Sequence, residues 1–348
     1  MSFDRASENS VRKSDHIRIA LHEDVEFHSV TTGFERYRLP YEALPEISRG
    51  EIDTSTSLFG HWLSMPLIIS SMTGGTQEGR AYNRIFAKAA QKFNIAMGVG
   101  SQRVALENSD LSDTFRVRDI APDILLFANL GAVQLNNGCN IESCTRAIEM
   151  IDADALILHL NPLQESIQPG GNTNFRGLAE KIKCVCENMG VPVIVKEVGH
   201  GISGRAAKLL ADAGVDCIDV AGAGGMSWAK VECYRGGHAQ SSISEWGTPT
   251  VDSLMAVRES LPKINIIASG GVRSGLDIAK SIALGANAAG MALPLLTAAS
   301  ESYDALEELI AQISEELTTA MFCAGMRTIE ELKSLPLIET SSIATPCI

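Results

Sequence analysis

Short apolar segments, rich in β-branched residues or glycine, alternate with longer segments of helical periodicity from residue 66 onward. The segments typical of strands are 66–72, 96–100, 124–131, 155–161, 192–199, 217–224, 265–272 and 288–294. Helices are expected near 79–93, 141–151, 174–189, 203–213, 250–260, 275–283 and 302–324, whereas the 101–120 connection is less regular. Strands that alternate with helices in this way form parallel sheets.

Eight strand-helix units are the number that closes a (β/α)8 TIM barrel, which we favour over an open, doubly wound sheet. We expect residues 66–348 to form the barrel and residues 1–65 to form an N-terminal extension that packs on it. The predicted carboxyl ends of the strands are rich in polar residues and glycine, as in SSMTGG, HLNPLQE and SGGVR. In such barrels the active site lies at this end of the strands.

The chain carries a formal net charge of −13 and no run of lysine or arginine residues. A field of this sign repels nucleic acid and anionic membranes, so neither is an expected partner. The cysteines include no CxxC pair, and no apolar run is typical of a signal peptide or a membrane span. These features predict a cytoplasmic protein whose thiols stay reduced.

Glycine-rich segments coincide with the ends of the seventh and eighth predicted strands, IIASGGVRSG at 266–275 and GANAAGMALP at 285–294. The loops after these strands of a TIM barrel often bind phosphate through backbone N–H groups and a helix N-terminus. Gly270 and Gly271 would allow close approach, and Ala292 and Leu293 would present N–H groups. The alternative is that the glycines only shape tight turns.

Lys196 and Glu197 are adjacent in the fifth predicted strand, so their side chains point to opposite faces. A lysine that projects inward near a phosphate-anchored cofactor would suit the N1/C2=O edge of a flavin, which is negatively charged when reduced. An internal ion pair would explain the same residue without a cofactor.

Hydroxyl, amide and guanidinium groups occur at the ends of the first three predicted strands. They belong to SSMTGGT at 70–76, GSQR at 100–103 and Asn129 in ANLG. Each is ordinary turn chemistry by itself. Together at one mouth they can hydrogen-bond the polar edge of a heterocycle, with Arg103 available for a phosphate.

The fourth predicted strand ends in the polar part of LILHLNPLQES, residues 156–166. His159 and Asn161 share one strand face, and Gln164 and Glu165 follow in the expected loop. A lone strand histidine is more often a core residue than a catalyst, but four polar groups at one carboxyl end favour a site. Glu165 is a hard oxygen ligand, and one carboxylate combined with substrate phosphates is typical of Mg²⁺.

Arg12 and Lys13 stand next to each other in RKSDHI, within an otherwise polar N-terminal segment. Two interpretations remain open at this point: a solvated tail, and a lid that folds over an anionic ligand.

Several of these motifs, with others between them, follow one another in the order RKSDHI, MTGGT, GVGSQR, HLNPLQE, VKEVGHGIS, AGAGGMSWAKVE, WGTPT and SGGVRSGLDIAKSIALGA. In this order they strongly resemble the type 2 isopentenyl-diphosphate isomerases, over nearly the whole chain. The resemblance implies an FMN-dependent TIM barrel that interconverts isopentenyl and dimethylallyl diphosphate. It also implies Mg²⁺, a flavin reduced by NADPH or NADH, and assembly as a homotetramer or homo-octamer.

The resemblance also implies roles for residues that match the motifs. The predicted flavin-binding residues are Ser70, Ser71, Met72, Thr73, Ser101, Asn129, Lys196, Ala221 and Met226, with the flavin phosphate at Gly270, Gly271, Val272, Ala292 and Leu293. The predicted substrate-binding residues are Arg12, Lys13, Ser101, Gln102, Arg103, His159, Asn161 and Gln164, and Glu165 would bind Mg²⁺. Ala221 and Met226 depart from the common SGAGGTSW pattern and remove two hydroxyls expected near the flavin.

The implied reaction is a 1,3-proton shift on an unactivated alkene, in which C4 gains a proton and C2 loses one. The sequence offers no obvious strong acid for this step, so we expect reduced FMN to act as acid and base. His159, Gln164 and Lys196 are the predicted catalytic side chains, which would position the substrate and tune the flavin.

Three alternatives remain. An FMN-dependent 2-hydroxy-acid oxidase would use a His-Gly-Gly-Arg segment after the sixth strand, whereas YRGGHAQ at 234–240 has these letters in another order. A nucleotide-oxidising barrel would need a loop cysteine as nucleophile, for which Cys233 is the candidate. The third alternative is a non-catalytic barrel that binds flavin or phosphate.

Overall fold

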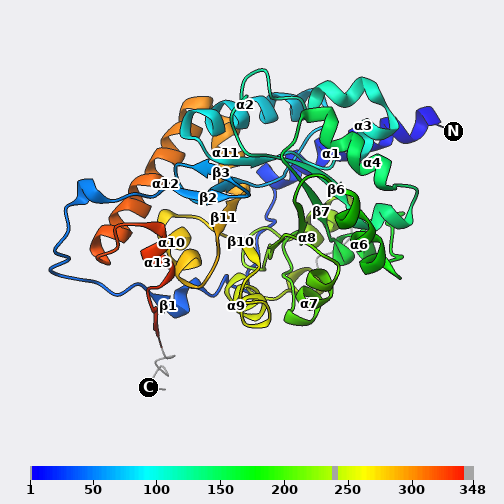
Figure 1. Ribbon diagram of the computed structural model, residues 1–348. Helices are drawn as coiled ribbons and strands as arrows, with labels where there is room; N and C mark the ends of the chain where they lie inside the picture. The colour runs from blue at the N-terminus through cyan, green and yellow to red at the C-terminus, as the bar shows by residue number, and fades with distance from the viewer. Residues whose placement is uncertain (1, 237–241, 341–348) are drawn as a thin grey trace, which may run out of the picture.

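A closed barrel of eight parallel strands forms the centre of the computed structural model, which describes residues 2–236 and 242–340 (Figure 1). The barrel strands are β4 (Leu67–Ile69), β5 (Ala96–Gly98), β6 (Leu126–Gly131), β7 (Ala155–His159), β8 (Val193–Lys196), β9 (Cys217–Asp219), β10 (Asn265–Ser269) and β11 (Ala288–Met291). Each strand pairs with its neighbours in sequence, and β11 closes the barrel against β4. The predicted strands and the (β/α)8 class are confirmed, and the doubly wound sheet is wrong.

Helices surround the barrel and bury one face against it. They are α1 (Ser2–His22), α2 (Gln77–Phe93), α3 (Arg103–Glu107), α4 (Ile141–Ile151), α5 (Pro162–Ile167), α6 (Leu178–Asn188), α7 (Gly204–Asp212), α8 (Trp228–Gly236), α9 (Thr250–Ser260), α10 (Gly275–Ala283), α11 (Leu293–Glu301), α12 (Tyr303–Cys323) and α13 (Ile329–Lys333). Hydroxyl side chains cap many N-termini: Thr76, Ser203, Ser274 and Ser302 each accept a backbone N–H of the helix that follows. All seven predicted helices are present.

Helices α3, α11 and α13 were not predicted, and three further segments differ from the sequence-based expectation. The polar N-terminal segment folds into α1, which packs against α8 and α11. The loop expected after Pro162 is the short helix α5, because a proline at the first helical position already has the helical φ angle. Residues 225–249, for which no helix was predicted, contain α8 and the 3-10 helix η5 (Ser242–Glu245).

Alternate residues of the barrel strands point inward. Phe127, Ile157, Ile194, Cys217 and Ile267 belong to one buried cluster inside the barrel, whereas the side chains between them pack outward against the helices. Two residues further along these five strands, toward their carboxyl ends, the inward positions become polar. These positions hold Asn129, His159, Lys196, Asp219 and Ser269. The interior therefore changes from an apolar layer to a polar one.

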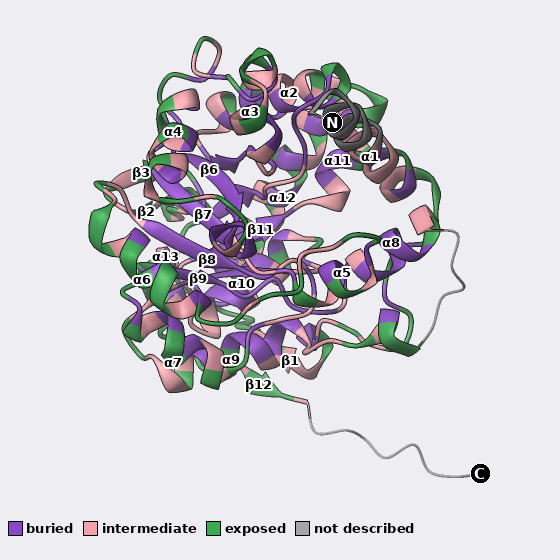
Figure 2. Cartoon of the chain, turned by 90° about the vertical axis from the view of Figure 1, so that its right-hand side faces the viewer, coloured by how far each residue is buried: buried purple, intermediate pink, exposed green. Residues whose placement is uncertain are grey.

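A hairpin of β2 (Thr56–Leu58) and β3 (His61–Leu63) covers the amino end of the barrel. Leu58 and Leu63 belong to the inner apolar cluster, and Phe59 packs edge-on against Phe127 with ring centroids 6.4 Å apart. In Figure 2 this hairpin lies at one end of the strands, and α5 and α8 lie at the other. The carboxyl end is thus the end that remains open to a ligand.

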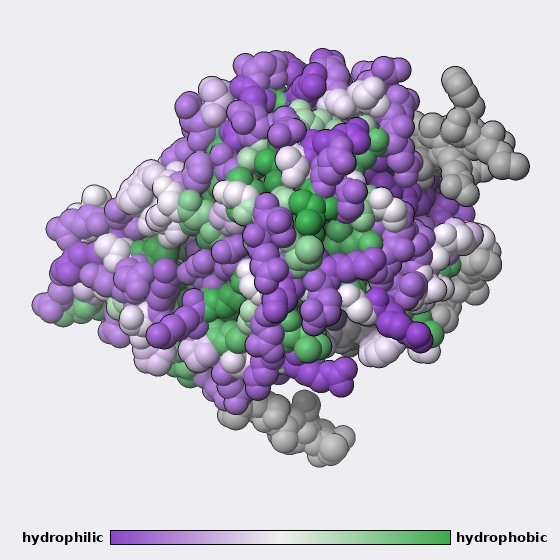
Figure 3. Space-filling model, turned by 45° about the vertical axis from the view of Figure 1, so that its right-hand side comes forward, coloured by the Kyte–Doolittle hydropathy of each residue, from purple (hydrophilic) through white to green (hydrophobic). Residues whose placement is uncertain are grey.

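The face shown in Figure 3 is mostly hydrophilic, with apolar side chains gathered toward its middle. A second small sheet pairs β1 (Tyr37–Arg38) with β12 (Ile338–Glu339). Within residues 2–236 and 242–340, no helix combines the length and apolar character needed to cross a membrane. The division of the chain at residues 65 and 66 stays a prediction.

Candidate active site

One cavity of about 250 Å³ lies at the carboxyl end of the barrel, and most of the predicted site residues line it. The lining residues that the sequence predicted are Arg12, Lys13, Ser70, Ser71, Met72, Thr73, Ser101, Arg103, Asn129, His159, Asn161, Gln164, Glu165, Lys196, Ala221, Met226, Gly270, Gly271, Val272, Ala292 and Leu293. They come from α1, from α5 and from the ends or following loops of all eight barrel strands. A solvated tail therefore does not describe Arg12 and Lys13.

Gln102 is the predicted residue that does not line the cavity. Its side chain is fully buried, and its Nε2 donates to the carbonyl oxygen of Ala147 at 2.8 Å. Its Oε1 accepts the backbone N–H of Asn129 at 2.9 Å. With both amide atoms engaged inside the protein, Gln102 braces β6 against α4, and we withdraw it as a substrate contact.

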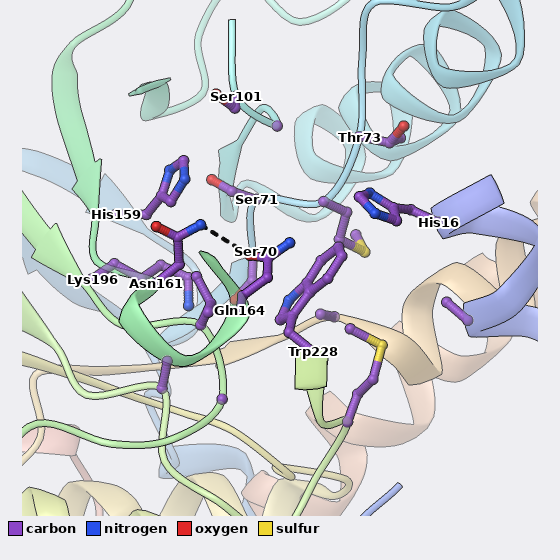
Figure 4. A pocket seen from close by; sticks show the side chains of 18 of the residues that line it. His16, Ser70, Ser71, Thr73, Ser101, His159, Asn161, Gln164, Lys196 and Trp228 are labelled. Carbon is purple, nitrogen blue, oxygen red and sulfur yellow. Dashed lines mark hydrogen bonds between the residues drawn. The ribbon is translucent and has the colours of Figure 1, made fainter. Parts of the chain in front are cut away.

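His159 is the last residue of β7, and its imidazole faces the cavity (Figure 4). Its Nδ1 lies 2.8 Å from Oδ1 of Asn129, so Nδ1 carries the proton and Nε2 is left as an acceptor. Burial, followed by the positive charges of Lys196, Arg103 and Lys13, lowers the pKa of His159 to about 4. The imidazole is therefore neutral near neutral pH.

Helix α5 places Asn161, Gln164 and Glu165 on one side of the cavity. Because they lie three and four residues apart across the start of this helix, Asn161 can reach both of the others. Its Nδ2 donates to Oε1 of Gln164 at 3.0 Å and to Oε1 of Glu165 at 3.1 Å. The Oδ1 atom of Asn161 is buried and has no hydrogen-bond partner. Asn161 thus has an oxygen without a hydrogen-bond partner, and its amide group lies next to the Glu165 carboxylate.

Glu232 on α8 is buried behind the cavity wall, supports residues that line the cavity, and was missed by the sequence analysis. Its carboxylate accepts from His16 at 3.0 Å, Gln164 at 3.0 Å and Arg235 at 2.7 Å. Burial alone would raise its pKa, but these hydrogen bonds and the charge of His16 lower the pKa of Glu232 to about 2. Glu232 thereby fixes Gln164 and joins α1 to α8, since His16 also packs edge-on against Trp228 at 5.0 Å.

Three cationic side chains gather at one part of the cavity: Arg12, Lys13 and Arg103. Burial, and then the charges of Arg12 and Arg103, lower the pKa of Lys13 to about 7. The Lys13 ammonium donates to the carbonyl oxygen of Ser101 at 2.8 Å, and Nε of Arg12 is buried without a partner. Like charges held this close make the site favourable for an anion.

Lys196 faces the cavity and Glu197 faces away from it, as their adjacency in the strand requires. The Lys196 ammonium donates to the Glu197 carbonyl oxygen at 3.0 Å and lies 3.4 Å from the Asp219 carboxylate. The internal ion pair is present, and Lys196 also lines the cavity, so its contact with a flavin stays a prediction. The Glu197 carboxylate instead accepts the N–H groups of the loop that follows, including Gly199 at 2.8 Å.

The glycine pair after β10 brings two loops into contact. Gly270 and Gly271 have φ angles of 100° and 72°, in the region that favours glycine. A Cβ on Gly270 would lie 2.1 Å from the carbonyl oxygen of Gly222, so a larger residue would push the loops apart. Beside them, α11 begins at Leu293 without a side-chain cap, so the N–H groups of its first turn, apart from Pro294, which has none, are suited to bind an anion.

The residues fit a flavin and a hard cation. The hydroxyls of Ser70 and Ser71 are buried in the cavity without a hydrogen-bond partner, which suits contact with a heterocycle. Glu165 and the unused Oδ1 of Asn161 suit one Mg²⁺ ion that takes its other ligands from phosphate and water. In the described ranges 2–236 and 242–340, no group of three or more His, Cys, Asp or Glu side chains forms a metal cage.

The comparisons with known proteins identify the family of this chain. Residues 7–110 and 164–339 match the family described as FMN-dependent dehydrogenase. An isopentenyl-diphosphate delta-isomerase of Nostoc sp. is 53% identical over 94% of this chain and 95% of its own length. That of Synechocystis sp. is 49% identical over 95% and 96% of the two chains. The chain belongs to the isopentenyl-diphosphate delta-isomerase family.

Solved structures with low sequence identity share the fold of this isopentenyl-diphosphate delta-isomerase family member. A lactate oxidase of Pediococcus acidilactici gives a TM-score of 0.68 at 18% identity, covering 98% of this chain and 94% of its own. A mandelate oxidase gives a TM-score of 0.64 at 17% identity, with 97% and 99% covered. At such identities the likeness shows the barrel alone.

The site of this family member does not favour the other enzyme classes considered. Of the segment YRGGHAQ, residues 237–240 lie outside the described ranges, and Arg235 is engaged by Glu232. Cys233 is buried in α8, does not line the cavity, and has a pKa raised by burial. A nucleophilic cysteine needs a depressed pKa and access to substrate, so Cys233 is unsuitable.

Proposed function

We propose that the protein interconverts isopentenyl and dimethylallyl diphosphate, with FMN and Mg²⁺ bound in the cavity at the carboxyl end of the barrel. The proposal rests on one observation: a single cavity is lined both by clustered cationic side chains and by buried polar atoms that have no hydrogen-bond partner. Such groups are costly to bury unless a ligand completes them. The ligand must therefore offer negative charge and hydrogen-bonding groups.

The clustered cations support a diphosphate. Arg12, Lys13 and Arg103 approach one another closely enough to lower the pKa of Lys13, and an anion between them would remove this repulsion. We infer that Glu165 and Asn161 hold the Mg²⁺, which would bridge to the same diphosphate. A carboxylate, an amide oxygen and phosphate oxygens are typical Mg²⁺ ligands.

The opposite part of the cavity supports the flavin. Ser70 and Ser71 would hydrogen-bond the ring, Lys196 would face its N1/C2=O edge, and the N-terminus of α11 would hold the phosphate with Gly270 and Gly271. Bound FMN, in its reduced state, would supply the acid and base for the 1,3-proton shift. Ala221 and Met226 line this part of the cavity without offering a side-chain hydroxyl.

Protein side chains would hold the substrate between these two groups. His159 is neutral and offers the acceptor Nε2, because Asn129 engages Nδ1. Gln164 is fixed by Glu232 and Asn161, so its amide keeps one orientation during the reaction. Apolar lining residues would exclude water from the alkene. They include Ile17, Ala20, Trp228 and Leu296.

We propose NADPH or NADH as the reductant, a cytoplasmic location, and assembly as a homotetramer or homo-octamer. We also propose residues 1–65 as an extension of the barrel formed by residues 66–348.

The test begins with the absorption spectrum of the purified protein, in which bound FMN gives its characteristic bands. The holoenzyme is then assayed for conversion of isopentenyl diphosphate after anaerobic reduction, with Mg²⁺ or with EDTA. We expect dimethylallyl diphosphate only from the reduced, Mg²⁺-loaded protein. Bound FMN without any isomerase turnover would contradict the proposal and support a non-catalytic flavin-binding barrel. Hydrogen peroxide formed from a 2-hydroxy acid would support the oxidase instead.

A further inference from the structure

Asp219 lies immediately behind the wall of the active-site cavity. It is the last residue of β9, in register with Lys196 on β8 and next to β10. Its side chain points into the barrel, because Cys217, two residues earlier, belongs to the inner apolar cluster. Asp219 is 4% exposed and does not line the cavity, whereas Lys196 and Ser269 do. Asp219 therefore acts on the cavity only through its neighbours.

Both oxygens of the Asp219 carboxylate have partners. Oδ2 lies 3.4 Å from Nζ of Lys196. Oδ1 accepts the hydroxyl of Ser269 at 2.6 Å and the backbone N–H of Ala221 at 3.3 Å. A buried carboxylate with several hydrogen bonds is held in one position. It thus forms a rigid anchor for the Lys196 ammonium.

The other contacts of Lys196 carry no net charge. They are the carbonyl oxygen of Glu197 at 3.0 Å and the Ser269 hydroxyl at 3.4 Å. The charge of Lys196 nevertheless reaches the cavity, because after burial it is the largest cause of the lowered pKa of His159. The net charge felt at the cavity wall is therefore set by Lys196 and Asp219 together.

We propose that Asp219 is a positioning residue that anchors Lys196 in the cavity wall and offsets its charge, and so limits how strongly the site favours reduced FMN. The inference rests on the proposed function in so far as FMN occupies this cavity. Reduced flavin is the more negative form, so an uncompensated cation beside it favours reduction and a missing cation disfavours it. Asp219 would hold the potential between these two extremes.

The test measures the reduction potential of bound FMN in Asp219→Asn, in Lys196→Met, and in the double variant. Asp219→Asn leaves the Lys196 cation without its counter-charge. We expect its preference for reduced over oxidised FMN to rise about tenfold, or about 30 mV for a two-electron couple. Lys196→Met should shift the potential in the negative direction. In the Lys196→Met background, adding Asp219→Asn should change the potential less than it does in the wild type, because no Lys196 ammonium remains for Asp219 to anchor.

Asp154→Asn is the matched control. Asp154 pairs with Arg118 at 2.6 Å just before β7, at the amino end of the barrel. Its substitution should lower the melting temperature without moving the flavin potential. If Asp219→Asn alone does not fold, the comparison of Lys196→Met with the double variant still tests the coupling, because the double variant buries no unpaired charge.

A potential in Asp219→Asn that equals that of Asp154→Asn, or lies below the wild-type value, would overturn the inference. Equal shifts with and without Lys196 would also overturn it. The wild-type isomerase assay separates this failure from failure of the proposed function. A wild-type protein that binds FMN without isomerising contradicts the function, whereas an active wild type with an unshifted Asp219→Asn contradicts only the role of Asp219.

Discussion

The two ends of the barrel are formed by the same eight strands but differ in the side chains that they bury. At the amino end, Leu58, Leu63 and Phe59 cover an apolar layer, and Asp154 pairs with Arg118 at 2.6 Å. At the carboxyl end, the inward side chains are polar, and Ser70, Ser71 and Asn161 keep buried atoms without partners. Burial of apolar side chains at the amino end stabilises the folded protein, whereas the buried polar atoms without partners at the carboxyl end lower its stability. Stability and ligand binding are thus assigned to different ends, as is usual for this architecture.

Substitutions at the two ends should therefore have opposite effects on stability and ligand binding. A change at the amino end should alter stability and spare ligand binding, and a change at the carboxyl end should do the reverse. The following four experiments test this contrast, in order of decreasing expected effect.

The largest effect is expected for Leu63→Ala at the amino end. Leu63 is 1% exposed in the hairpin, and a cavity left by a truncated core leucine costs about 2–5 kcal/mol. We expect a lower urea midpoint but an unchanged Kd for FMN at temperatures where the variant is folded. Trp62→Ala is the control, since Trp62 is 62% exposed on the same strand. Loss of FMN affinity in folded Leu63→Ala would show that the two ends are not independent.

Next in size is Glu165→Gln at the carboxyl end. Removing the charge of the proposed Mg²⁺ ligand should lower Mg²⁺-dependent kcat/KM by about 100-fold, the upper end of the loss that is typical even when a group that only supports a metal ligand is removed. The Tm and the FMN Kd should change little, because Glu165 lies on the short helix α5 rather than on a barrel strand. Equal losses of FMN affinity and of activity would instead assign Glu165 a structural role.

A smaller effect concerns the pH dependence of Lys13. Its pKa is about 7 in the ligand-free protein, so it is protonated below pH 7 and loses its proton as the pH rises through 7. Because kcat/KM reports the free enzyme, this parameter should fall above about pH 7. Lys13→Met should be about tenfold less active at pH 6 and should lack that step, the loss expected for one charge-assisted hydrogen bond.

The pH profile of kcat/KM for Lys13→Met serves as the reference, because any ionisation of the substrate affects both proteins equally. Stability provides a second readout, because the folded protein holds fewer protons on Lys13 than the unfolded chain between about pH 7 and the ordinary value of 10.5. Stability from this group should therefore rise with pH across that window, and the rise should be absent in Lys13→Met. An identical pH profile in both proteins would remove Lys13 from the anion site.

The smallest effect is expected where this chain lacks a hydroxyl beside the proposed flavin. Ala221→Ser should tighten FMN binding about threefold, since one neutral hydrogen bond contributes roughly 0.5–1.5 kcal/mol. Ala221 has a φ angle of 37°, so the substitution changes the side chain in a backbone already held by Asp219 and Gly201. Ala206→Ser on α7, outside the cavity, is the control. Weaker FMN binding in Ala221→Ser would indicate that the position has no room for a hydroxyl.

Much of the fold followed from residue periodicity. The strands were predictable because each couples β-branched or small apolar residues to a polar or glycine-rich end, and their number fixed the barrel. Helices α1, α5 and α8 were among those missed, and for physical reasons. Their sequences are polar, and tertiary contacts such as the hydrogen bond from His16 to Glu232 add to a weak intrinsic preference.

The site was predictable where a motif carried its own chemistry, as for Glu165 and the glycine pair Gly270 and Gly271. Gln102 was misjudged because sequence adjacency to Ser101 and Arg103 does not reveal that its side chain turns into the wall. Glu232 was missed because its position in α8 could not be related to Gln164, 68 positions away in sequence. Asp219 could have been predicted from the sequence. Like His159 and Lys196, it is a polar residue two positions after an inward-facing apolar residue of its strand.

The most direct test of the central claim is anaerobic turnover by the reduced holoenzyme without added NADPH or NADH. Isopentenyl diphosphate and Mg²⁺ are mixed with dithionite-reduced, FMN-bound protein, and product formation and flavin absorption are followed together. The account predicts many molecules of dimethylallyl diphosphate per flavin while the flavin stays reduced, because a proton shift consumes no electrons. The absence of product, or at most one product per flavin with accompanying reoxidation, would contradict it.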